Sequence, residues 1–98
     1  MTYGRLDVFW PDGKIETFSL ARSNVSVGRS TGSTIVLDTD TISRYHFSIA
    51  KDNDAVYLID LESVNGTYLD GVKLVQGERY PLNGGEEIVA GQLRMTYH

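Results

Sequence analysis

The 98-residue sequence contains no cysteine, only two prolines and a single tryptophan. Without thiols it has no disulfide framework, no thiolate zinc site and no cysteine nucleophile. A chain that gains nothing from an oxidising compartment is expected in the cytoplasm. No stretch approaches the ~20 consecutive apolar residues of a membrane-spanning helix, and the first residues lack the apolar core of a signal peptide. The sequence therefore predicts no membrane partner.

An excess of positive charge is also missing. The chain has nine lysines and arginines against thirteen aspartates and glutamates, which gives a net charge of −4. Nucleic-acid-binding domains normally carry a basic patch or stripe, whereas the basic residues here are scattered along the chain. Nucleic acid is therefore not an expected partner. An anion-binding site on this acidic protein must be built locally from placed groups and not from the overall field.

Helical periodicity is absent as well, because no segment keeps apolar residues at helical spacing for ten residues or so. Short β-branched and aromatic runs instead alternate with turn signals, which is typical of an all-β sandwich or barrel. We expect one domain over residues 1–98 with eleven strands, at residues 5–10, 14–20, 24–28, 34–37, 45–51, 55–61, 67–69, 72–74, 79–82, 86–90 and 92–97.

Two turns and several core positions follow from the same pattern. Pro11-Asp12-Gly13 and Asp70-Gly71 have the composition of tight turns between paired strands. Leu6, Val8 and Trp10 share one face of the first strand, and Phe18 and Leu20 are expected in the core.

Three polar segments each stand at the end of a strand-like run: Gly28-Arg29, Ser43-Arg44-Tyr45-His46 and Ser63-Val64-Asn65-Gly66-Thr67. If these strand ends meet at one rim, their donors would suit a phosphate attached to a peptide. An arginine fork holds two phosphate oxygens at once, and glycine lets the backbone approach closely. The amide of Asn65 offers both a donor and an acceptor to an extended backbone.

Each segment also has a purely structural interpretation. Arg29 and Arg44 would then be solvated surface residues, Asn65-Gly66 an ordinary turn, and His46 a core histidine that ties a loop to the backbone. For His46 we prefer this structural role.

Catalysis and metal binding are not expected. The only other histidine is the terminal His98, and Asp38 and Asp40 lack the rest of an EF-hand pattern. Ser43 and His46 are three residues apart, but no nucleophile elbow surrounds them. The glycines form no nucleotide-binding loop. We therefore expect no enzyme activity, no metal and no cofactor.

The order and spacing of these segments resemble the forkhead-associated (FHA) domain. The resemblance is carried by four stretches, Gly28-Arg29, Ile35-Val36-Leu37, Ser43-Arg44-Tyr45-His46 and the run from Leu58 to Thr67. It implies an eleven-stranded β-sandwich of two mainly antiparallel sheets whose loops at one rim bind phosphothreonine peptides. The expected partner is a phosphothreonine-containing protein, and the domain by itself is expected to be monomeric.

Carried over residue by residue, the resemblance implies that Arg29 contacts the phosphate and Ser43 donates its hydroxyl to it. Arg44 would supply a further polar or basic contact, and Asn65 would grip the ligand backbone. The loops would be shaped by Gly28, His46 and Gly66. Selectivity in the family lies mostly in loop shape, so the candidate specificity residues here are Ser30, Thr31, Ser63 and Val64.

One departure from the family pattern concerns Val64, because some members carry a hydroxyl residue there and valine offers no side-chain donor. Asp70-Gly71 replaces a frequent Asn-Gly, but both dipeptides form the same turn. The alternative hypothesis is a phosphate-independent interaction or assembly module. It would use the sandwich face or an exposed strand edge such as Thr67 to Leu69.

Overall fold

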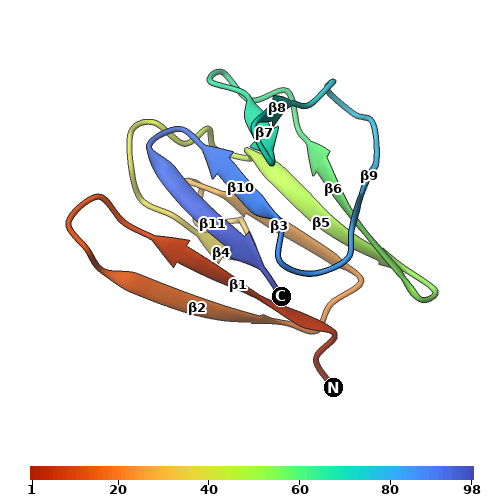
Figure 1. Ribbon diagram of the computed structural model, residues 1–98. Helices are drawn as coiled ribbons and strands as arrows, with labels where there is room; N and C mark the ends of the chain where they lie inside the picture. The colour runs from red at the N-terminus through yellow and green to blue at the C-terminus, as the bar shows by residue number, and fades with distance from the viewer.

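The computed structural model describes all 98 residues and contains eleven strands and no α-helix (Figure 1). The strands are β1 (Gly4–Phe9), β2 (Ile15–Leu20), β3 (Asn24–Gly28), β4 (Ile35–Val36), β5 (Phe47–Asp52), β6 (Ala55–Asp60), β7 (Thr67–Leu69), β8 (Val72–Lys73), β9 (Tyr80–Leu82), β10 (Glu87–Ala90) and β11 (Leu93–Tyr97). Each of the eleven predicted strands is present, most of them shorter by one or two residues. No helix in the structure is long and apolar enough to cross a bilayer.

The strands form two sheets. One has six strands in the order β2-β1-β11-β10-β7-β8, and the other has five in the order β4-β3-β5-β6-β9. Every pair is antiparallel except the short parallel pair between β3 and β4. This arrangement confirms the prediction of an all-β sandwich with mainly antiparallel sheets. Both termini lie in the lower part of Figure 1, away from the segments that join β4 to β5 and β6 to β7.

The core lies between the sheets and consists of nineteen buried hydrophobic residues. Apolar residues recur at every second position of the strands, and successive side chains point to opposite faces of a sheet. The apolar residues of a strand therefore reach the core together. Leu6 and Val8 in β1, for example, are completely buried. In β6, Val56 and Leu58 are buried and Tyr57 is half-buried, as expected of a strand with neighbours on both sides.

The two turns predicted from composition are present. Asp70 and Gly71 have φ values of 48° and 84°, the left-handed conformation that a two-residue hairpin of type I′ requires at both positions. Gly13 has a φ of 94° in the turn between β1 and β2.

Three details differ from the expectation. Trp10 lies just beyond β1 and is half-buried, and its indole Nε1 donates to Glu16 Oε1 (2.7 Å). Phe18 is likewise half-buried and packs against the core from outside. The strand Thr67–Leu69 is not an exposed edge, since β7 pairs with β10 on one side and with β8 on the other.

Candidate functional site

The three polar segments predicted from the sequence meet at one rim of the sandwich. The backbone N–H of Arg29 donates to the carbonyl of Ser43 (3.0 Å), and that of Ser30 donates to the carbonyl of Arg44 (3.1 Å). These bonds join the β3–β4 loop to the β4–β5 loop. The β6–β7 loop is attached to the same place, because the backbone N–H of Val64 donates to Ser43 Oγ (2.9 Å).

Gly28 makes the first of these contacts possible. A Cβ at this position would stand 2.0 Å from the carbonyl oxygen of Arg44, far inside van der Waals contact. Any side chain would therefore push the two loops apart. The sequence predicts for Gly28 a close approach of the backbone to a ligand and a part in shaping the loop. In the structure its close neighbour is the backbone of this chain at Arg44.

His46 links the second loop to the third from inside the protein. It is fully buried, its Nδ1 accepts the backbone N–H of Ser43 (3.0 Å), and its Nε2 lies 2.9 Å from the carbonyl oxygen of Gly66. Since a backbone N–H can only donate, Nδ1 carries no proton and Nε2–H donates to Gly66. Burial lowers the pKa of His46, while the Gly66 carbonyl and the charge of Asp60 act in the opposite direction.

This geometry leaves His46 unable to act as a base toward the Ser43 hydroxyl, because both ring nitrogens are engaged with backbone groups. The structure also holds no group of three or more histidine or acidic side chains positioned to bind a metal ion. What the rim offers is a set of hydrogen-bond donors and positive charges.

The two arginines of the site are free to meet an anion. The five ion pairs of the structure involve Arg5, Lys14, Arg79, Arg94 and His98. Neither Arg29 nor Arg44 has a carboxylate oxygen within 4.0 Å or a hydrogen bond from its side chain. Arg29 is half-buried and Arg44 is exposed, and their backbones lie on the two loops that hydrogen-bond to each other. Two arginines whose guanidinium groups form no ion pair are thus carried by the loops that meet at this junction.

Ser43 and Asn65 are already used in part to build the rim. Ser43 Oγ accepts from Val64, which leaves its own hydroxyl proton available to a ligand. The Asn65 side-chain amide donates to the carbonyl of Thr41 (2.8 Å), while its side-chain oxygen has no partner. Thr41 in turn accepts the backbone N–H of Gln92 at Oγ1 (3.1 Å) and so ties the β10–β11 turn to the site.

The third loop is anchored by a buried carboxylate that the sequence analysis missed. Asp60, 2 % exposed at the end of β6, accepts hydrogen bonds from the hydroxyl groups of Ser63 (2.5 Å) and Thr67 (2.6 Å) and from the backbone N–H of Ser63 (3.3 Å). The sequence does contain a signal for this anchor. Asp60 is an acidic residue at the end of an otherwise apolar strand, and a serine follows it three residues later.

This anchor corrects one expectation. Ser63 was a candidate specificity residue, but it is buried and its hydroxyl points to Asp60. The other three candidates remain at the surface. Ser30 is half-buried and its hydroxyl contacts the Tyr45 hydroxyl (3.4 Å), Thr31 is exposed, and Val64 is 89 % exposed.

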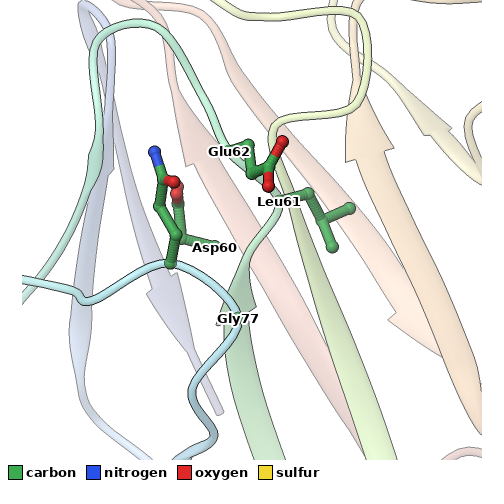
Figure 2. A pocket seen from close by; sticks show the side chains of 5 residues that line it. Asp60, Leu61, Glu62 and Gly77 are labelled. Carbon is green, nitrogen blue, oxygen red and sulfur yellow. The ribbon is translucent and has the colours of Figure 1, made fainter.

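A hollow lies beside the third loop, between the end of β6 and the segment that leads to β9 (Figure 2). Its lining consists of Asp60, Leu61, Glu62, Gln76 and Gly77. Two of these five residues are acidic and none is basic, so the hollow repels an anion. The unpaired arginines and the free hydrogen-bonding groups lie instead on the three loops that meet at the rim.

Comparison with known proteins agrees with this arrangement. The FHA domain family model matches residues 25–91. The oxoglutarate dehydrogenase inhibitor of Corynebacterium jeikeium is 32 % identical over 80 residues, which cover 82 % of this chain and 54 % of that protein. The chain spans about half the length of the curated relatives it matches.

Solved structures share the fold. The FHA domain of CT664 from Chlamydia trachomatis superposes with a TM-score of 0.86 at 27 % identity, over 96 % of this chain and 94 % of that one. The N-terminal FHA domain of S. cerevisiae Rad53p, solved with a phosphothreonine peptide, gives a TM-score of 0.79 at 25 % identity, over 94 % and 90 % of the two chains. By its sequence match and its fold, this chain belongs to the FHA domain family.

Proposed function

We propose that this chain binds phosphothreonine-containing peptides at the rim where its three loops meet. Arg29 and Ser43 contact the phosphate, Arg44 adds a second positive charge, and Asn65 pairs with the peptide backbone. One observation carries the proposal: hydrogen bonds hold the loops of Arg29 and Ser43–Arg44 together, and neither guanidinium has a carboxylate of its own chain to neutralise it.

The physical chemistry of the rim suits a phosphate monoester. A phosphorylated threonine carries about −1.5 to −2 charges and three acceptor oxygens. Hydrogen bonds to charged groups contribute about 1.5–3 kcal/mol each, so a few phosphate contacts dominate a small peptide interface. Affinity on the micromolar scale, about −8 kcal/mol, is the natural consequence. An unphosphorylated threonine lacks these contacts, and a kinase therefore switches docking on.

We further infer that residues 1–98 act as one monomeric, non-catalytic domain in the cytoplasm, because a chain without cysteine gains nothing from an oxidising compartment. No side-chain arrangement at the rim pairs a nucleophile with a base, since His46 is occupied by the backbone. Size-exclusion chromatography at several protein concentrations tests the monomer, and a concentration-dependent shift would contradict it.

Titration of matched peptides tests the binding function. Wild-type protein is expected to bind a phosphothreonine peptide at least about 100-fold more tightly than its unphosphorylated form, since two charge-assisted bonds are lost. Arg29→Ala should remove most of this difference, whereas Arg29→Lys should keep part of it because lysine retains the charge but not the fork. Arg22→Ala is the matched control, because Arg22 is also free of ion pairs but lies in the β2–β3 loop.

Equal binding of the two peptides by wild-type protein, or full binding by Arg29→Ala, would reject the proposal. Salt provides a second test. The exposed contacts to phosphate are screened as ionic strength rises, so affinity is expected to fall between low and physiological salt. An affinity that does not change with salt would contradict a site built from unpaired arginines.

A further inference from the structure

Three of the five basic residues that form no ion pair lie at the rim or next to it. Four of the nine lysines and arginines form ion pairs with carboxylates, namely Arg5, Lys14, Arg79 and Arg94. Among the other five, Arg29 and Arg44 belong to the site already described. A third, Lys73, lies on β8 next to the β6–β7 loop. The chain has thirteen acidic residues, so Lys73 is not left unpaired by a shortage of carboxylates.

The side chain of Lys73 extends from β8 toward the rim. Lys73 pairs with Tyr68 in the β7–β8 ladder. Its Cε nevertheless reaches Gly66, since a Cβ built on that glycine would stand 2.9 Å from it. The lysine stem therefore covers Gly66, which is buried although it belongs to a surface loop. The ammonium group follows directly after Cε, and it consequently lies beside the Asn65-Gly66 dipeptide.

We propose that Lys73 is a specificity-determining residue that binds an acidic side chain flanking the phosphothreonine in the ligand. This inference rests on the proposed function, in which Asn65 pairs with the peptide backbone. A peptide held by Asn65 passes next to Gly66 and so comes within reach of the Lys73 ammonium. A lysine is a point charge with three rotatable donors, so it accepts a carboxylate in several orientations.

The sign of the selectivity follows from the charges around Lys73. No carboxylate of the protein lies within 4.0 Å of its nitrogen, and the two arginines of the rim add to the positive potential. The Lys73 ammonium attracts an aspartate or glutamate of the ligand and repels a lysine. A neutral flanking residue leaves the affinity unchanged. The pair is solvent-exposed, so its effect on affinity is about two- to fivefold.

A purely structural role for Lys73, in which the stem only shields Gly66, makes a different prediction. Lys73→Met separates the two roles because methionine keeps an unbranched stem over Gly66 and removes the charge. If Lys73 acts through its charge, Lys73→Met binds neutral-flank peptides as wild type does and loses the preference for acidic flanks, and Lys73→Arg keeps it. If Lys73 acts only as a cover, Lys73→Met changes neither the selectivity nor the affinity.

The experiment takes one phosphothreonine peptide and sets each flanking position in turn to aspartate, asparagine or lysine. Binding is measured by fluorescence anisotropy for wild type, Lys73→Met, Lys73→Arg and Lys51→Met at low and high salt. Lys51 provides the matched control because it is a second unpaired lysine, at the β5–β6 hairpin, where its ammonium contacts the carbonyl of Asn53. The expected result is an acidic preference of about two- to fivefold at one flanking position in wild type, Lys73→Arg and Lys51→Met. This preference should disappear in Lys73→Met and shrink at high salt.

Two outcomes overturn the inference, and they differ from each other. If wild type binds no phosphothreonine peptide, the proposed function fails and this inference fails with it. If wild type binds phosphothreonine peptides but with equal affinity for aspartate, asparagine and lysine flanks, or if Lys73→Met keeps the acidic preference, only the role of Lys73 is rejected.

Discussion

Nδ1 of His46 lies 3.0 Å from the backbone nitrogen of Ser43. This partly buried hydrogen bond sets the conformation of the loop that presents the Ser43 hydroxyl, and the same imidazole holds the β6–β7 loop through a buried bond to the carbonyl of Gly66. One core side chain thus positions two of the three loops of the rim without touching a ligand.

Replacement of His46 by alanine should destabilise the protein by about 2–4 kcal/mol. The change opens a cavity and leaves the Ser43 N–H and the Gly66 carbonyl without partners. Urea unfolding measures the loss, and His98→Ala, at the exposed end of the chain, is the control that should stay close to wild type. A cost below about 1 kcal/mol for His46→Ala would mean that the loops hold their positions without the imidazole.

Stability should decrease as the pH falls below about 6.5, the ordinary pKa of histidine. Burial holds the pKa of His46 in the folded protein below that value. Between the folded and the unfolded pKa, the unfolded chain therefore binds more protons than the folded one, and the free energy of unfolding falls with falling pH. The contribution is fully present above about pH 6.5.

Urea unfolding at a series of pH values checks this prediction, together with an NMR titration of the His46 ring. The acid-side loss should persist in His98→Gln, because that histidine takes no part in the rim. A His46 ring that titrates at or above its ordinary pKa would contradict the prediction.

Gly28→Ala should destabilise the protein and weaken phosphopeptide binding at the same time. The new Cβ would stand 2.0 Å from a backbone carbonyl of the neighbouring loop, so the loop itself must move. Gly32→Ala is the matched control, since the one atom that a Cβ there would clash with is the Tyr45 hydroxyl, the far end of a side chain that is 47 % exposed. Thermal unfolding should show a loss of about 2 kcal/mol or more for Gly28→Ala, and a much smaller one for Gly32→Ala. Similar losses in both would argue against a special contact at Gly28.

Val64→Thr should strengthen phosphothreonine binding without changing stability. The side chain of Val64 is 89 % exposed, and its backbone N–H already bonds to Ser43 Oγ. A hydroxyl at this position would stand next to the proposed phosphate site and add a charge-assisted bond, which corresponds to about a tenfold gain in affinity. Calorimetric titration measures the gain, and Val72→Thr, at an exposed position on β8, serves as the control. No gain for Val64→Thr would place the phosphate away from the third loop.

The sequence alone determined the strands, the sandwich and the three polar segments that the fold then brings together at the rim. Alternating apolar positions such as Leu6 and Val8 specify a strand with one buried face. Asp70-Gly71 specifies the turn between β7 and β8, because both residues readily adopt the left-handed backbone conformation that the turn needs. These signals are local, so they appear in a single sequence. The motif spacing from Gly28 to Thr67 then indicated the FHA family.

Only the tertiary structure decided which groups are free and which are occupied. The sequence does not show that the hydroxyl of Ser63 points inward to Asp60, or that β7 is paired along both edges. It also does not show that the side chain of Lys73 reaches from β8 to Gly66. Each of these facts depends on a hydrogen bond or contact between segments that the fold brings together. A sequence pattern reports which backbone conformation each residue favours and which face of a strand it occupies. Whether a side chain is available to a ligand depends instead on the groups that the rest of the chain places beside it.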